Sequence, residues 1–270
     1  MAKKSGKKNK PAQASASAPA PASAPASPPK SDSSLLVVGT TAIALIALVV
    51  GLGAGHHAPA ETESTPTSGH HSPPPPTGPI DPQSRLLHPE QLTEQAPETY
   101  AVEMHTSAGD FVIDVTRAWA PNGADRFYNL VRSGYFTDIA FFRVIPGFMA
   151  QAGIHGRPEV ARAWHDAAIP DDPVVQHNTR GAVTFATAGP NTRTTQFFVN
   201  YADNSRLDAN GFAPFGHVRD MATIDHLDSQ YGEGAPNGSG PDQARIQREG
   251  NRYLRADFDG LDYILSARIL

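Results

Sequence analysis

One stretch decides how this 270-residue chain is organised: Phe141-Phe142-Arg143-Val144-Ile145-Pro146-Gly147-Phe148-Met149-Ala150-Gln151. Its apolar density predicts one or two buried strands. Pro146-Gly147 predicts a tight turn between them, because proline presets φ and glycine is free to take positive φ. Arg143 is costly to bury unless other groups satisfy its guanidinium, and Gln151 lies within reach across the turn. The stretch therefore offers a planar charged donor beside an apolar floor of Phe148 and Met149.

A plainer interpretation of Arg143 is also open. The residue could occupy an edge strand, with its aliphatic stem covering apolar surface and its charged head in water. A second informative stretch, described below, favours the functional interpretation.

The charge and composition of the chain exclude several classes of site. Residues 1–34 contain six lysines and one aspartate and therefore have a net charge of +5. The net charge of the whole chain is −5, so the remaining 236 residues have a net charge of −10. The folded part is thus acidic and has no basic patch of the kind that binds nucleic acid. The absence of cysteine removes disulfides, thiolate nucleophiles and cysteine metal ligands. Histidine and carboxylate spacings match no metal-ligand motif, so we expect no metal site.

Three segments precede the predicted folded domain. Residues 1–34, rich in Ala, Pro, Ser and Lys, predict a disordered arm. Residues 35–55 are 21 uncharged residues, long enough for a transmembrane helix; the alternative is a cleavable signal peptide, whose apolar region is normally shorter. Residues 56–98 are rich in proline, which is typical of a linker. Because the lysines precede the apolar segment, we expect a single-pass protein of the cytoplasmic membrane, with its N-terminus in the cytoplasm and its domain outside.

The remaining residues, 99–270, predict a mainly β domain. Alternating apolar residues at 101–105 and 111–115 indicate a hairpin, and a helix is expected from Pro121 to Gly134. Residues 155–180 are expected to be a loop. Further strands are expected at 139–151, 181–187, 196–200, 212–219 and 263–269, and further helices at 221–227 and 242–257. Short strands in this number suit a closed or nearly closed antiparallel barrel.

The second informative stretch runs from Gly181 to Asn200 and includes Ala-Gly-Pro-Asn-Thr at 188–192 and Gln-Phe-Phe at 196–198. Together with Phe-Arg-Val-Ile-Pro-Gly-Phe-Met-Ala-Gln at 142–151, it resembles the cyclophilin family of peptidyl-prolyl cis–trans isomerases. Leu207-Asp208 and the run at 215–218 continue the likeness over the whole predicted domain. The resemblance implies a closed eight-stranded antiparallel barrel capped by two helices.

The same resemblance implies a site. Arg143 takes the place of the catalytic arginine, and Gln151 matches the glutamine that positions it. The resemblance implies that the proline pocket is lined by Phe148, Met149, Phe198, Leu207 and Phe212. It implies that the groove for the substrate residues before the proline is lined by Ala186, Thr187, Ala188 and Gln196. Thr187 stands where the family usually has asparagine, and Phe212 stands near the place of a common histidine. No cofactor is implied.

Three functions remain open at this stage. The first is an active, membrane-tethered isomerase that assists the folding of exported proteins and acts as a monomer on proline-containing polypeptides. The second is a module that binds proline segments without useful turnover, for which the pocket alone would suffice. The third is a structural role carried by the Pro-rich linker. Retention of both Arg143 and Gln151 favours the enzyme.

Overall fold

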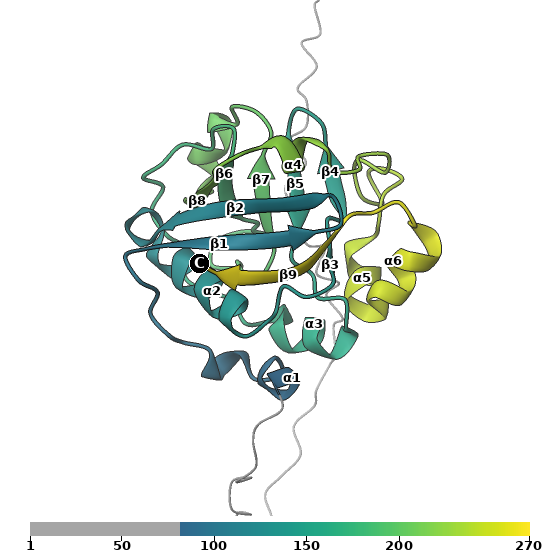
Figure 1. Cartoon of the computed structure of the whole chain (residues 1–270), viewed down its shortest axis with the longest axis horizontal. Coiled ribbons are helices and arrows are strands. Elements are labelled where there is room, and N and C mark those ends of the chain that lie inside the picture. The colour runs from purple at the N-terminus through teal and green to yellow at the C-terminus, as the bar shows by residue number, and fades with distance from the viewer. Residues whose placement is uncertain (1–81) are drawn as a thin grey trace, which may run out of the picture. The chain divides into compact units, whose positions relative to one another are not determined.

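The computed structural model describes residues 82–270, with side chains from residue 84 onward (Figure 1). The predicted arm at 1–34, the predicted transmembrane helix at 35–55 and most of the predicted linker lie outside the described residues. Within 82–270, every helix is too short or too polar to cross a membrane.

A single antiparallel sheet forms the framework of the described domain (Figure 1). Its nine strands are hydrogen-bonded in the order β3-β9-β1-β2-β8-β6-β7-β5-β4. Their bounds are β1 Thr99–Thr106, β2 Gly109–Thr116, β3 Ile139–Ala140, β4 Arg143–Ile145, β5 Met149–Ala152, β6 Ala182–Phe185, β7 Phe197–Asn200, β8 Pro214–Val218 and β9 Tyr263–Ile269. The predicted mainly β, antiparallel class is confirmed.

The hairpin β1–β2 shows why the alternating pattern forms strands. Val102 lies opposite Ile113, and Met104 lies opposite Phe111. These four side chains are buried while their neighbours along each strand are more exposed, as expected when one face of a pleated sheet covers a core. The predicted hairpin and the predicted closing strand at 263–269 are both confirmed.

The closed eight-stranded barrel was a wrong prediction, because the sheet has nine strands and its edge strands β3 and β4 do not pair. These edges are joined by Phe141 and Phe142 alone. Phe141 packs into the main core and Phe142 into a second, smaller core, and the backbone N–H of Phe141 donates to the carbonyl of Asp262 at 2.9 Å. The two phenylalanines turn the chain between the cores. The strand region predicted at 139–151 is therefore divided, with β3 at one edge of the sheet and β4 at the other.

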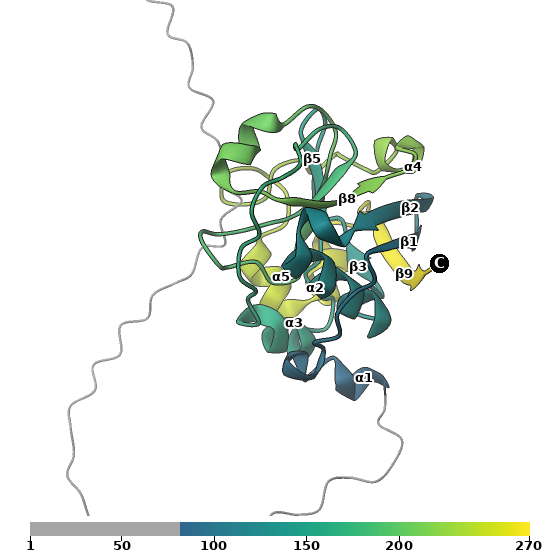
Figure 2. The ribbon, with the colours of Figure 1, turned by 90° about the vertical axis from the view of Figure 1, so that its left-hand side faces the viewer.

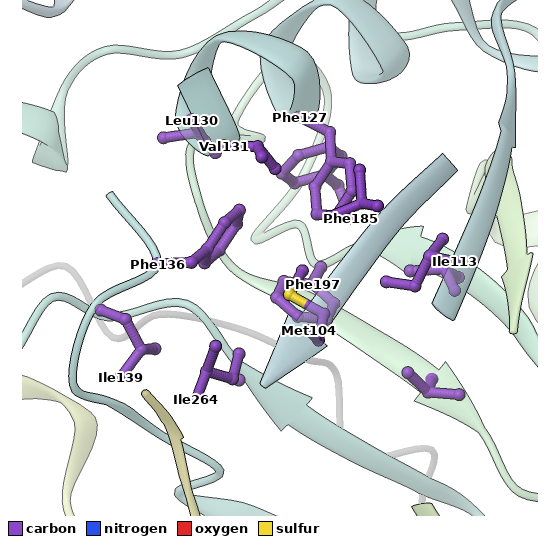
Figure 3. Close-up of a cluster of buried hydrophobic side chains, with 14 of the residues drawn as sticks. Met104, Ile113, Phe127, Leu130, Val131, Phe136, Ile139, Phe185, Phe197 and Ile264 are labelled. Carbon is purple, nitrogen blue, oxygen red and sulfur yellow. The ribbon is translucent and has the colours of Figure 1, made fainter. Parts of the chain in front are cut away.

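Helices cover the sheet and close its core. Figure 2 shows α2 beside β1 and β9, with α3 and α5 next to one another. The helices are α1 Pro82–Arg85, α2 Pro121–Arg132, α3 Pro158–His165, α4 Ala222–Asp225, α5 Gln243–Glu249 and α6 Asn251–Asp257, with 3₁₀ turns η1 Pro89–Gln91, η2 Arg117–Trp119 and η3 Ser205–Asn210. In Figure 3, Phe127 and Val131 of α2 lie beside Phe185 of the sheet, and Leu130, Met104 and Phe197 belong to the same buried cluster.

Two helix predictions need correction. The expected loop at 155–180 contains α3, whose Val160, Ala161 and Trp164 bury one face; Pro158 is compatible with a helix because it lies in the first turn. The single helix expected at 242–257 is divided at Gly250, which has φ +62° and lies against the carbonyl of Gly156. Because glycine has no Cβ to collide with this carbonyl, the chain can take a positive φ there, and the helix is interrupted.

The packed domain begins before the predicted boundary at residue 99. Leu86 and Ala96 are buried in the main core, and the indole Nε1 of Trp164 donates to the carbonyl of Leu86 at 2.8 Å. Leu87, the next residue, is 39% exposed. The end of the predicted linker is therefore part of the fold.

The adjacent leucines provide a matched stability test. Leu86→Ala should reduce the free energy of unfolding by about 2 kcal/mol or more, because it removes a buried side chain and leaves a cavity. Leu87→Ala should change it by less than about 0.5 kcal/mol, as usual for surface positions. Urea unfolding followed by fluorescence measures both. Equal effects of the two substitutions would contradict the packing described for this segment.

Candidate active site

Arg143 and Gln151 face one another across the β4–β5 hairpin, as the turn at Pro146-Gly147 predicts. They are direct partners in the strand register, and Gly147 takes φ +72° in the turn. The Nη1 of Arg143 donates to Oε1 of Gln151 at 3.1 Å. Both side chains are buried, at 3% and 0% exposure. The guanidinium is thus a fixed donor inside the protein rather than a surface cation. Arg143 does lie on the edge strand β4, but the interpretation that placed its charged head in water is wrong.

A cluster of apolar side chains adjoins the arginine. Met149, Ala186, Phe198, Leu207 and Phe212 are buried together, with Phe148 packed against them. Phe198 and Phe212 meet edge to face, with ring centroids 5.7 Å apart. The guanidinium carbon of Arg143 lies 5.9 Å from the ring centroid of Phe148. The structure therefore brings the predicted pocket walls together beside the charged donor.

The predicted groove residues lie next to this cluster. Ala186, Thr187, Ala188 and Gln196 line a cavity of about 250 Å³, whose other wall comes from α3 and α5. Gln196 connects the two regions, because its Oε1 accepts from Nε2 of Gln151 at 2.9 Å. The hydroxyl of Thr187 lies 2.9 Å from that of Thr192. The side chain of Thr187 is thus hydrogen-bonded within the loop that contains it.

Glu233 is a site residue that sequence reasoning missed. Its carboxylate accepts from Nε and Nη2 of Arg143, both at 2.7 Å. Partial burial alone would raise the pKa of Glu233, but hydrogen bonds from Arg143, its positive charge and the N–H of Gly234 outweigh burial and lower it. Glu233 lies 90 residues from Arg143 along the chain, and no motif connects the two.

Sequence reasoning also missed a network of three buried asparagines, which is hydrogen-bonded to the backbone of the pocket walls. Asn178 donates through Nδ2 to the carbonyl of Phe212 at 2.8 Å, and Asn204 donates to the carbonyl of Phe148 at 2.8 Å. Asn200 links them, accepting from Nδ2 of Asn204 and donating to Oδ1 of Asn178. Buried polar groups of this kind fix backbone positions when they are paired. They hold two of the aromatic walls in place.

His155 lines the same cavity and is not suited to acid–base chemistry near neutral pH. Burial lowers the pKa of His155 to about 4, and the positive charge of Arg157 adds to the effect. Its Nδ1 accepts from the backbone N–H of Arg157 at 3.0 Å. No cluster of three metal-binding side chains occurs within residues 84–270.

Comparison with known proteins identifies the class. The family model for cyclophilin type peptidyl-prolyl cis-trans isomerases matches residues 101–247. The chain therefore belongs to this enzyme family, as the resemblance in the sequence indicated.

Individual relatives are moderately similar. The chain is 35% identical over 139 residues to peptidyl-prolyl cis-trans isomerase-like 3 of Rhizopus delemar, covering 47% of this chain and 81% of that protein. Its human counterpart is 34% identical over 132 residues, with the same coverages. A solved cyclophilin type isomerase of Cryptosporidium parvum aligns with a TM-score of 0.47 and 21% identity, covering 64% of this chain and 98% of that chain.

The buried histidine predicts a pH-dependent stability. The unfolded chain binds a proton at His155 near pH 6.5 and the folded chain only near pH 4. Stability therefore falls as the pH falls through this window, by about 2 kcal/mol between pH 7.5 and pH 5. In His155→Asn, whose amide oxygen can replace Nδ1 as the acceptor, that contribution should disappear. Urea unfolding at both pH values measures it, and an unchanged pH difference in the variant would contradict the burial argument.

Proposed function

We propose that this chain accelerates cis–trans isomerisation of X–Pro bonds in polypeptides, with Arg143 as an electrostatic catalyst. The observation that carries the proposal is the buried guanidinium, 3% exposed, fixed between Gln151 and Glu233 and bordered by an apolar cluster. Membership of the isomerase family supports it.

The reaction needs a partner for a twisted amide. A peptide bond resists rotation by about 18–20 kcal/mol because the nitrogen lone pair is delocalised into the carbonyl. Before proline the two isomers are close in energy, yet they exchange only in tens to hundreds of seconds. In the twisted state the lone pair returns to the nitrogen, which then becomes a better hydrogen-bond acceptor. A donor that meets this nitrogen binds the transition state more tightly than the planar ground state, and such a difference accelerates a reaction.

Arg143 has the properties that this role requires. A planar, positively charged donor held in place needs little reorganisation during the reaction. Such a donor contributes about 3 kcal/mol, or about a hundredfold in rate. The adjoining apolar side chains exclude water, which strengthens the donation. We assign the proline ring to Phe148, Met149, Phe198, Leu207 and Phe212. We assign the preceding residues of the substrate to the groove formed by Ala186, Thr187, Ala188 and Gln196.

The cellular setting is a second part of the proposal. The uncharged segment 35–55, preceded by six lysines, supports a membrane tether with the domain outside the cytoplasm. The clients would then be exported proteins, and the domain would act as a folding catalyst held near the membrane. Release of the full chain from membranes by salt or carbonate washing would refute the tether.

Substitution of Arg143 tests the catalytic role. Arg143→Ala should lower the isomerisation rate of a short X–Pro peptide by about a hundredfold, because the donor to the twisted amide is lost. Exchange NMR on the full chain measures the rate, and titration of the same peptide measures its binding. Arg268→Ala, which removes an arginine that is 68% exposed and paired with Glu103 on the sheet, serves as the control.

Two outcomes would contradict this proposal. If the wild-type chain binds the peptide without accelerating exchange, the domain is a binding module. If Arg143→Ala retains the wild-type rate, catalysis comes from another group.

A further inference from the structure

The ion pair between Arg143 and Glu233 combines bidentate geometry with burial of its arginine. Two parallel hydrogen bonds of 2.7 Å join the two groups, with Arg143 3% and Glu233 30% exposed. Bidentate pairing of this kind fixes the plane of a guanidinium as well as its position. The orientation of Arg143 is therefore set by Glu233 in addition to the residue across the hairpin.

The segment that carries Glu233 is built to hold it in place. The carbonyl of Glu233 accepts from the N–H of Gly240 at 2.8 Å. A Cβ at Gly238 would lie 2.2 Å from the same carbonyl oxygen, so only glycine allows the loop to close there. The loop is also attached to the domain at both ends, through Asp228 N–H to Asp262 at 2.8 Å and Asp242 N–H to Tyr253 at 3.1 Å. Glu233 thus projects from an ordered support.

The pairing determines which donors of Arg143 remain for a substrate. A guanidinium has five N–H groups. Glu233 takes one on Nε and one on Nη2, and Gln151 takes one on Nη1. Of the two that remain, the one on Nη1 has the weakly accepting Sδ of Met149 3.9 Å from its nitrogen. Within the described residues, the second N–H of Nη2 is left as the strong donor without a protein acceptor.

We propose that Glu233 is a positioning residue for the isomerase reaction, holding Arg143 so that its remaining Nη2 donor meets the twisted amide. The inference rests on the proposed role of Arg143 and adds to it a residue from the 228–242 loop. Glu233 itself does not touch the reacting atoms. Its effect passes through the orientation of the guanidinium, because misplaced catalytic groups lose rate even when they stay close to the substrate.

The test compares Glu233→Gln with a matched control in the full chain. Glu103→Gln is the control, since Glu103 is 29% exposed and also accepts from an arginine Nε at 2.7 Å, on strand β1. Glu233→Gln should lower kcat for an X–Pro peptide by about tenfold with KM changed by less than about twofold. Glu103→Gln should change neither. Glu233→Asp, which keeps the charge on a shorter side chain, should fall between wild type and Glu233→Gln, and it replaces Glu233→Gln if that variant does not fold.

A spectroscopic readout separates positioning from a general structural effect. The NMR signal of the Arg143 Nε–H, assigned by its absence in Arg143→Ala, should move in Glu233→Gln and stay unchanged in Glu103→Gln. A moved signal with lower kcat supports the inference.

Two results would overturn the positioning role of Glu233, and a third would refute the proposed function. A moved signal with unchanged or higher kcat overturns the inference, and higher kcat would show that Glu233 competes with the substrate for Arg143. An unmoved signal overturns it as well. If the wild-type chain does not isomerise the peptide, the proposed function itself fails.

Discussion

A buried positive charge is the constraint on which this site depends. The guanidinium of Arg143 is almost completely removed from water, and such a group is tolerated only where other groups satisfy its charge and donors. Gln151 meets this need from the neighbouring strand, and Glu233 meets it from a distant loop. The energetic requirement for folding and the geometric requirement of the proposed catalysis therefore coincide, since the contacts that make burial possible also fix the orientation of the donor.

The sheet places this charge at the border of its core. Phe141 and Phe142 carry the chain from one edge strand to the other, and Arg143 opens β4 directly after them. One edge of the sheet then carries the arginine, and the adjoining strands β5 and β7 supply Met149, Gln151 and Phe198. Asn178 and Asn204 hold the backbone of the aromatic pocket walls at Phe212 and Phe148. The proposed electrostatic mechanism uses no nucleophile, metal or proton transfer, and it needs such rigidity because orientation is then the only means by which the donor acts.

The sequence predicted those features that short-range patterns determine. Alternation located the hairpin β1–β2, Pro146-Gly147 located the turn, and the residues flanking that turn were correctly expected to face one another. Features that depend on distant partners were not accessible. Nothing local marks Glu233 as the partner of Arg143, and the open edge between β3 and β4 follows from two phenylalanines that enter different cores. Helix α3 was missed because Pro170 and Pro173 indicated an irregular segment, although both residues lie beyond the end of the helix at His165.

The pH dependence of turnover by the full wild-type chain tests the central claim most directly. If a fixed guanidinium is the catalyst, kcat/KM for an X–Pro peptide should be constant between pH 6 and pH 9, since arginine keeps its proton throughout this range. The pKa of Glu233 is lowered and that of His155 is about 4, so neither group changes its charge there. A bell-shaped profile, or a step near neutral pH, would show that a titrating side chain takes part and would contradict electrostatic catalysis by Arg143.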